Sequence, residues 1–577
     1  PSATVPGGTS PTRTQAPPGS TATKVSGGAD GPVPDLLHIL ETCHWTKLYH
    51  HALPYLAAHP SEVRRLLSAR DASGATPLHT AAWRAPPALT DRLLSALAPG
   101  EADLLLLRDD DGNTPLHLAA GNGASHAVLH RLLQLGPPNS STLQNQQGDT
   151  PLHLACAAAD GTAIALLKGT APAVRDESGA SPLHVALAHR APEGAVLELL
   201  AACPAAAAVE DKQGMLPLHY VGATLDASPA VVRALIAAHP AGATAGSKVG
   251  DTPLHLACCN RKNRVGGNRT GTAVMGDREE EVLRLLVEAG PESLGTTNDE
   301  MFTPLHACAV FEAPSPVSQI LMRGSPSAVR ATTLANSFGA TPLHIAAAQP
   351  SVSSSLHNVL ALGSPDAAAA QDRLRRTPLH VAAQNVHATP RLILALAALN
   401  PAGPSTTTQR GHLPLHLAAQ SQSSVEVVRA LLGTHPEAAQ VRNRSANTPL
   451  HDAAKYKASA DVVGVLLAAF PEAIYVQNQY GNLPIHCATA YQATGHIVQL
   501  LLQAWPESTT VQNRNLDAPL HYAAAYDSPP EAIRALLDAS PSAILLLNKS
   551  GESPLDRARA NGARREVVQM LEAAGTA

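Results

Sequence analysis

Thirteen histidines recur at one position of a repeated tetrapeptide, two residues after its proline. Imidazole is a common general base and metal ligand near neutral pH, so such a series could carry chemistry. Successive members lie about one repeat apart, which is too far for two rings to share a metal ion, and we therefore expect a structural role. The residues are His79, His117, His153, His184, His219, His255, His306, His344, His380, His416, His451, His486 and His521.

A second candidate for chemistry is the pair His255 and Cys258, whose i, i+3 spacing could mimic a pair of metal ligands. Other repeats carry alanine at the cysteine position, as at Ala120 and Ala419, and Cys156 occupies the same position. Small residues there favour close packing of buried side chains over metal binding. The seven cysteines form no CxxC pair, so we predict no metal site, no zinc ribbon and no disulfide framework.

Nucleotide binding is a third possibility, because Gly266 and Gly271 are separated by four residues, as in a phosphate-binding loop. Thr272 stands where the lysine of such a loop is required, and no strand is expected before it. The chain also lacks GxSxG, HExxH and paired-carboxylate signals outside its repeats. We predict that the protein is not an enzyme and has no catalytic residue and no cofactor.

The elements that carry these residues come from an internal repeat. The tetrapeptide TPLH or a close variant occurs fourteen times, and most spacings fall between 35 and 38 residues. In the unit that begins at Gly411, this glycine supplies the positive φ of a tight turn, and Pro414 fits the first turn of a short helix. A longer second helix places Val427, Val428, Leu431 and Leu432 on one apolar face. Each unit is therefore predicted to be a turn, a helix, a second turn, a second helix and a loop.

The string DDDGNTPLHLAA from Asp109, followed by an apolar second helix, resembles the ankyrin repeat, and the resemblance covers about residues 70 to 577. It implies an all-α solenoid of helix-turn-helix units with short β-turn or hairpin fingers. It also implies that each motif histidine bonds backbone groups and braces adjacent turns. The implied function is a non-catalytic protein-protein interaction scaffold or adaptor that binds partners on its concave face and fingers.

Four units depart from this pattern at the turn glycine, which is replaced by Met301, Arg375, Ala446 and Leu516. A left-handed backbone is costly for a residue with a Cβ atom. We therefore expect these four turns to adopt another geometry.

Composition sets the outer boundaries of the array. Residues 1–34 consist mainly of Pro, Gly, Ser, Thr and Ala, which predicts a disordered tail. Apolar residues at the helical period predict N-terminal capping helices over 35–70, and the repeat array follows over 71–577. The last unit, 549–577, has Asp556 in place of the histidine and carries four arginines, which predicts a polar C-terminal cap.

A long insertion near 260–280 separates the two helices of one unit and predicts a protruding loop. Its basic tract could contact an acidic partner, or the segment could be only a solvated loop. The tract consists of Arg261, Lys262, Arg264 and Arg269.

Aromatic residues give the sharpest candidate for partner binding. Tyr456, Tyr491 and Tyr526 each fall five residues after the motif histidine in three successive repeats, so stacking would align them in one column. In ankyrin-like geometry this position ends the first helix, whose row lines the concave surface, and tyrosine offers rigid, amphipathic contact area there. The alternative is that these rings pack between neighbouring repeats and brace the interhelix turns.

Charge at the turn tips gives a second candidate. The early fingers are acidic, as at Asp110 and Glu177, whereas the late fingers are basic. A partner with the complementary asymmetry could be oriented by such a gradient, although solvated turns of mixed charge would look the same. The basic residues that we select as candidates are Arg375, Arg376, Arg410 and Arg444.

The global properties favour other proteins as partners. A net charge of -5 over 577 residues gives no general attraction for nucleic acid, and no apolar stretch is long enough to insert into a membrane. We expect a monomer inside the cell, in the cytoplasm, with the nucleus as the alternative. Two other functions stay open: a passive structural spacer, and the regulatory portion of a larger protein whose catalytic or membrane domain is absent.

Overall fold

The computed structural model describes residues 35–97, 100–259, 276–311, 315–322, 326–350 and 362–576. The tail predicted over 1–34 and the basic tract of the insertion lie outside these residues. The chain divides into two compact units, with described residues up to 293 in the first and residues from 294 onward in the second. Helices, turns and loops make up the described residues, which contain no strand, and the expected all-α repeat solenoid is confirmed.

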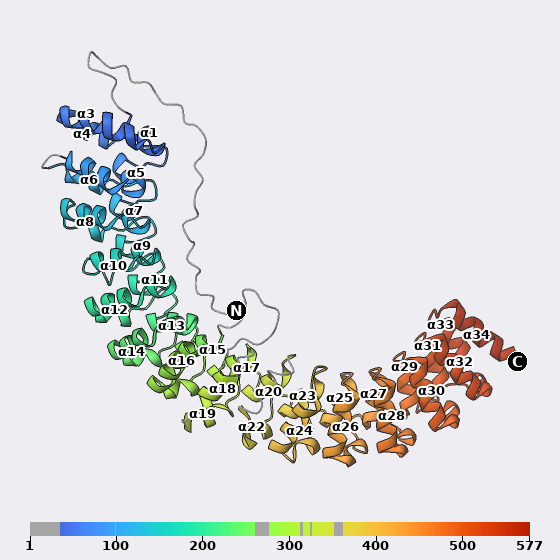
Figure 1. Cartoon of the computed structure of the whole chain (residues 1–577). Coiled ribbons are helices and arrows are strands. Elements are labelled where there is room, and N and C mark those ends of the chain that lie inside the picture. Colours follow the sequence, from blue (N-terminus) through green and yellow to red (C-terminus); the bar gives the residue numbers. More distant parts are fainter. Residues whose placement is uncertain are drawn as a thin grey trace. The chain divides into compact units, whose positions relative to one another are not determined.

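Each motif proline begins a short helix, because a proline in the first turn has no helical hydrogen bond to lose. We call these the first helices (Figure 1). In the first unit they are α5 (Pro77–Arg84), α7 (Pro115–Gly121), α9 (Pro151–Ala157), α11 (Pro182–Ala188), α13 (Pro217–Thr224) and α15 (Pro253–Cys259). In the second unit they are α17 (Pro304–Val310), α20 (Pro342–Ala348), α23 (Pro378–Gln384), α25 (Pro414–Gln420), α27 (Pro449–Lys455), α29 (Pro484–Ala490), α31 (Pro519–Ala525) and α33 (Pro554–Ala560).

Each repeat also has a second helix, and these second helices form the other layer of each compact unit. In the first unit they are α6 (Pro87–Ser95), α8 (His126–Leu135), α10 (Gly161–Leu167), α12 (Glu193–Ala202), α14 (Pro229–Ala238) and α16 (Asp277–Ala289). In the second unit they are α18 (Ser315–Met322), α24 (Pro390–Leu399), α26 (Val425–Thr434), α28 (Ala460–Ala469), α30 (Gly495–Ala504), α32 (Pro530–Ala539) and α34 (Arg565–Thr576). Their apolar faces bury residues such as Val428 and Leu431 against the first helices.

Shorter elements join and precede the helix pairs. Residues 36–67 form α1 (Leu36–Glu41), α2 (Trp45–Lys47), the π-helix η1 (Leu48–Ala52), α3 (Leu53–Ala58) and α4 (Pro60–Leu67). Two short α-helices, α19 (Pro326–Ala331) and α22 (Pro365–Ala369), follow α18 and α20. The 3₁₀-helices are η2 (Ala102–Leu106), η3 (Ser140–Thr142), η4 (Pro204–Ala208), η5 (Pro240–Ala243), η7 (Pro291–Gly295), η8 (Gly403–Ser405), η9 (Pro436–Ala439), η10 (Pro471–Tyr475), η11 (Pro506–Thr510) and η12 (Pro541–Leu545).

The motif histidines link consecutive repeats. The backbone N–H of Thr448 donates to Nδ1 of His451 at 3.2 Å, so that nitrogen carries no proton and the other must carry it. Nε2–H of His451 then donates at 3.1 Å to the carbonyl of Asn482. Asn482 lies in the turn at 478–482 that precedes the next first helix, and we call each such turn a finger. The same bond joins His416 to Asn447, and both rings are fully buried. The bracing role implied by the ankyrin resemblance is confirmed.

The turns without glycine keep the same geometry as the others. Residues Met301, Arg375, Ala446 and Leu516 have φ between 57° and 62°, so the expectation of another geometry was wrong. The cause is an Asn or Asp at the start of each finger. Oδ1 of Asn443 accepts the backbone N–H of Ser445 at 2.9 Å and of Asn447 at 3.1 Å. These two bonds fix the turn and hold Ala446 in the left-handed region.

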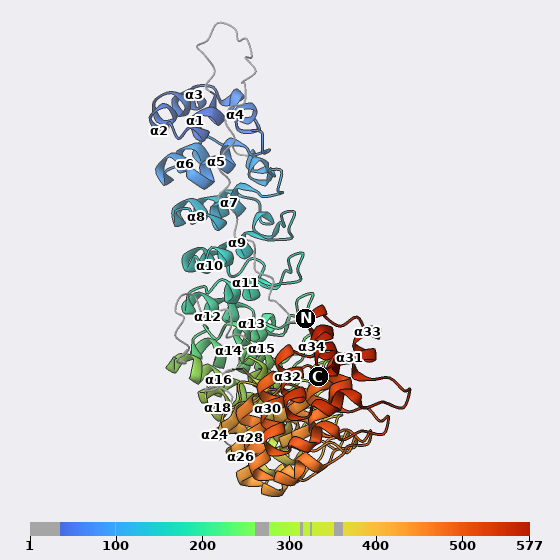
Figure 2. The same ribbon diagram turned by 90° about the vertical axis from the view of Figure 1, so that its right-hand side faces the viewer.

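Neighbouring fingers are also tied to one another through the backbone. In the second unit the N–H of Arg444 donates to the carbonyl of Arg410 at 3.1 Å, and the N–H of Gln479 donates to Ser445 at 3.1 Å. Figure 2 shows these loops projecting along one side of the second unit. The fingers therefore present their exposed side chains in a row.

We predict that acid destabilises the fold through its buried histidines. Burial lowers the pKa of His117, His184, His219, His380, His451 and His486 to about 4 and that of His416 to about 3. Unfolded histidine titrates near 6.5, so the stabilisation is present above pH 6.5 and is lost as the pH falls through about 4. Between pH 7.5 and 6 we expect a loss of about 1 kcal/mol for each such histidine. Urea unfolding followed by circular dichroism measures it, and equal stability at both pH values would contradict the prediction.

We predict that Ala446→Gly stabilises the protein by about 1 kcal/mol, because it relieves a left-handed backbone at a residue with a Cβ atom. The matched control is Gly481→Ala at the same turn position, where a Cβ would lie 2.8 Å from the backbone nitrogen of Arg514 and must destabilise. Urea midpoints of the two variants measure both effects. A less stable Ala446→Gly protein would show that the turn does not carry this strain.

Candidate functional site

The three candidate tyrosines lie at the ends of α27, α29 and α31, where each is the C-cap residue. Their exposed fractions are 41% for Tyr456, 48% for Tyr491 and 49% for Tyr526. The Nζ atom of Lys455 lies 5.0 Å from the ring centroids of both Tyr456 and Tyr491, which is the geometry of a cation-π contact. About half of each ring therefore faces solvent, and a lysine lies beside two of the rings.

The four candidate arginines differ in the ion pairs and hydrogen bonds that they form within the fold. Arg376 forms an ion pair with buried Asp372 at 2.8 Å and donates to Gln384, so much of its guanidinium holds its own repeat. Arg375 donates to Gln371 at 3.3 Å from an exposed turn. Among the described residues, the exposed side chains of Arg410 and Arg444 form no ion pair. These two cations are thus the candidates left free for a ligand.

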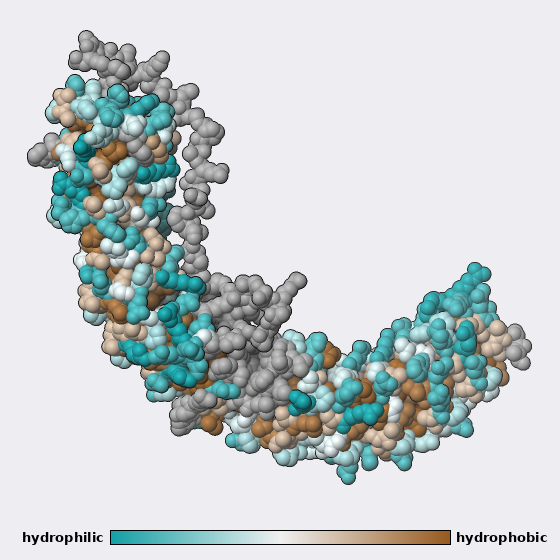
Figure 3. Space-filling view, viewed as in Figure 1, coloured by the Kyte–Doolittle hydropathy of each residue, from teal (hydrophilic) through white to brown (hydrophobic). Residues whose placement is uncertain are grey.

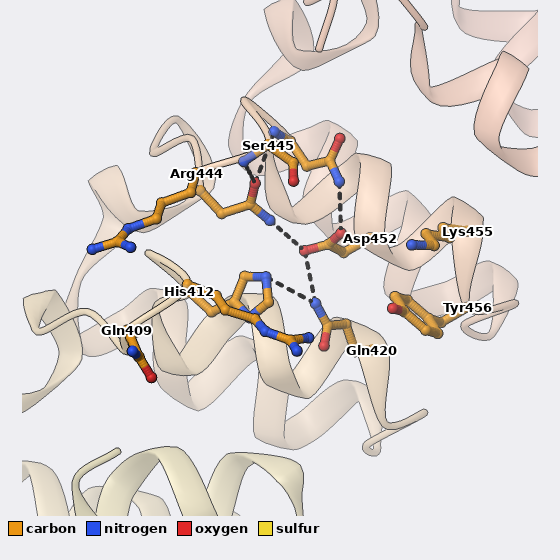
Figure 4. Close-up of a pocket in the computed structure, with 11 residues that line it drawn as sticks. Gln409, His412, Gln420, Arg444, Ser445, Asp452, Lys455 and Tyr456 are labelled. Carbon is orange, nitrogen blue, oxygen red and sulfur yellow. Dashed lines mark hydrogen bonds between the residues drawn. The ribbon is translucent and has the colours of Figure 1, made fainter. Parts of the chain in front are cut away.

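A hollow of about 520 Å³ brings several of these candidates together (Figure 4). Arg410 and Arg444 line it from two neighbouring fingers, and Lys455 and Tyr456 line it from the end of α27. The hollow joins three of the seven residues predicted from the sequence. Tyr491 and Tyr526 lie in later repeats, and Arg375 and Arg376 lie in an earlier finger, so these four do not line it.

A residue that the sequence analysis missed, Asp452, forms part of the lining of this hollow and is 1% exposed. Its carboxylate accepts hydrogen bonds from Gln420 at 3.1 Å, Asn443 at 3.3 Å and Asn447 at 3.2 Å (Figure 4). Burial raises the pKa of Asp452 to about 6, opposed by these hydrogen bonds and by the charge of Lys455. The signal in the sequence was a charged residue at a position that is apolar in most repeats, such as Leu417.

The charges that line the hollow favour the binding of an anion. Burial, followed by the charges of Arg410 and Lys455, lowers the pKa of His412, which also lines the hollow. The one carboxylate in the lining is buried and engaged by three amides, whereas the cations face solvent. Charge-assisted hydrogen bonds from guanidinium groups to an incoming carboxylate would be the strongest interactions available there.

The cysteines that were considered as metal ligands are packed inside the repeats. Cys156 and Cys258 are fully buried, as expected from the alanines at their position, and burial raises the pKa of the Cys156 thiol. Over the described ranges, no group of three or more His, Cys, Asp or Glu side chains is placed to hold a metal ion. No helix within the same ranges has both the length and the apolarity needed to cross a membrane.

We predict that Asp452→Asn gains stability relative to the native chain as the pH rises. The pKa of this carboxyl is higher in the folded state than the usual 3.8, so its contribution is largest below pH 3.8 and is lost as the pH rises through about 6. Between pH 5.5 and 7.5 we expect the difference in unfolding free energy to shift by about 1 kcal/mol in favour of the variant. Parallel urea titrations measure it, and a difference independent of pH would refute the assignment.

Comparison with known proteins supports the repeat assignment. The family model described as ankyrin repeats, in three copies, matches residues 88–176, 379–474, 415–513 and 450–545. A search of curated proteins finds no match. The matched segments lie in both units and coincide with the helix pairs and histidine-braced fingers described above. The chain therefore belongs to the ankyrin-repeat family.

Proposed function

We propose that this chain is a non-catalytic scaffold or adaptor that binds partner proteins on the face formed by the fingers and first helices of its second unit. Ankyrin repeats generally mediate protein-protein interactions, and solenoids use extended surfaces of this kind. The residues that we assign to this face are Tyr456, Tyr491, Tyr526, Arg375, Arg376, Arg410 and Arg444.

The observation that carries this proposal is the hollow between Arg410, Arg444 and Tyr456. Arg410 and Arg444 form no ion pair among the described residues, and Tyr456 is 41% exposed, so folding leaves much of their binding capacity unused. Tyrosine and arginine are also the residues most often enriched at the energetic centre of protein interfaces. Surface side chains of this type, on rigid elements, favour recognition over a purely mechanical role.

We place this binding inside the cell, in the cytoplasm, with the protein acting as a monomer. Five cysteines, Cys43, Cys156, Cys203, Cys308 and Cys487, are free thiols, and a chain with several free thiols fits a reducing compartment. A monomer leaves both the fingers and the first helices of the second unit open to a partner.

We predict that a variant with Tyr456, Tyr491 and Tyr526 all changed to alanine stays folded and loses its partners. The rings are about half exposed, so truncation removes contact area without opening the core. Proximity labelling with the intact chain and with the variant, followed by mass spectrometry, measures the loss, and circular dichroism checks the fold. We expect specific partners to fall at least about tenfold in the variant, since aromatic anchors dominate interfaces.

The matched control changes Leu394, Tyr475 and Leu545 to alanine. These residues belong to the same unit and are exposed by 49%, 56% and 73%, but they lie on α24 and on the 3₁₀-helices η10 and η12. Partners should persist in this control. A partner set that is unchanged in the tyrosine variant would reject the proposed face, and a chain that enriches no partner at all would favour a spacer.

A further inference from the structure

The fingers of the second unit carry exposed cations that have no ionic partner. Arg373, Arg410, Arg442, Arg444, Arg514 and Lys549 are all exposed, and none of them forms an ion pair within the described part of the chain. The space-filling view shows hydrophilic residues along the upper edge of the second unit (Figure 3). The face therefore combines these positive charges with exposed apolar side chains at the finger tips, such as Leu374, Tyr480 and Leu516.

The carboxylates of the same fingers are already engaged. Asp372 is buried and pairs with Arg376 at 2.8 Å. Asp517 is buried and accepts a hydrogen bond from Asn548, and Glu552 lies 3.5 Å from Arg557. The carboxylates of the fingers from residue 372 onward are thus engaged within the fold, whereas these cations form no ion pair among the described residues. An approaching anion meets a net attractive field.

The hollow concentrates this charge. Arg410 and Arg444 reach it from adjacent fingers whose backbones are joined by a 3.1 Å hydrogen bond, so the two side chains start from fixed positions. Lys455 also lines it, beside the ring of Tyr456. Asp452, the only carboxylate in the lining, is 1% exposed and receives three amide hydrogen bonds.

We propose that the partner segment bound by this face is an extended acidic peptide whose glutamate or aspartate side chains are received by Arg410, Arg444 and Lys455, and by Arg514 farther along. This inference rests on the proposed function and adds the chemistry of the partner. Neighbouring repeats are about 10 Å apart, and an extended polyproline II chain advances about 3.1 Å per residue and returns to the same face at every third residue. One carboxylate at every third residue therefore matches one finger.

The density of charge favours a peptide over a nucleic acid. Duplex DNA carries one negative charge for about every 1.7 Å of its axis, which is far denser than about one unpaired cation per repeat. The chain as a whole has a net charge of -5, which opposes binding of a long polyanion. An acidic segment of about ten to fifteen residues would cover the row from Arg410 to Arg514 at the spacing above.

The test uses the full chain and a fluorescent 15-residue peptide with glutamate at every third position. A second peptide replaces each glutamate with glutamine, and a third probe is a single-stranded oligonucleotide of equal charge. The binding variant is Arg410→Glu with Arg444→Glu. The control is Arg391→Glu with Arg429→Glu, which makes the same change of charge at exposed residues of α24 and α26.

We expect the acidic peptide to bind at least about tenfold more tightly than the glutamine peptide and to weaken as salt rises, because the attraction is electrostatic. The Arg410→Glu, Arg444→Glu chain should lose at least about tenfold in affinity, and the control less than about threefold. Equal affinity for both peptides, equal losses in both variants, or tighter binding of the oligonucleotide would overturn the proposal. So would no binding of the acidic peptide at about 1 mM.

Failure here is distinguishable from failure of the proposed function. If the acidic peptide does not bind but the tyrosine variant still loses its partners, the face is correct and the acidic chemistry is wrong. If the tyrosine variant keeps its partners while the acidic peptide binds through Arg410 and Arg444, the peptide chemistry stands and the wider tyrosine face is wrong.

Discussion

Within each compact unit, a neutral imidazole joins a first helix to the finger of the next repeat. Its Nδ1 accepts a backbone amide at the start of its own helix, and its Nε2–H donates to a carbonyl one repeat later, as in His451 and Asn482. Protonation would remove the Nδ1 acceptor and leave a charge in a buried site, which explains why burial lowers the pKa of these rings. Because the bond recurs at one position, it holds neighbouring repeats of one compact unit in the same phase.

Because neighbouring repeats keep this phase, exposed residues at the same position of successive repeats lie in a row on the surface. Tyr456, Tyr491 and Tyr526 share one position in three successive repeats, so each lies at the end of its first helix. The finger turn, closed by Asn443 through two backbone amides, directs Arg444 outward instead of into the core. Binding capacity is therefore carried by side chains that the scaffold does not need, and this separation lets ankyrin surfaces differ while the fold stays the same.

The sequence predicted what is local and what repeats. Proline followed two residues later by histidine marked the start of each first helix except α33, and the alanines at the position of Cys258 predicted its burial. Prediction was wrong at Ala446 and Leu516, because the left-handed turn is held by Asn443 and Asn513 rather than by the residue at the turn itself. The hollow was not predictable, since it needs two fingers, one helix end and buried Asp452 to come together.

Hydrogen exchange of the chain with and without its captured partner would locate the bound surface without any substitution. We expect new protection in the fingers around Arg410 and Arg444 and at the end of α27, next to Tyr456, with little change in α26 and α28. Protection confined to the second helices or to the first unit would contradict the proposed binding face.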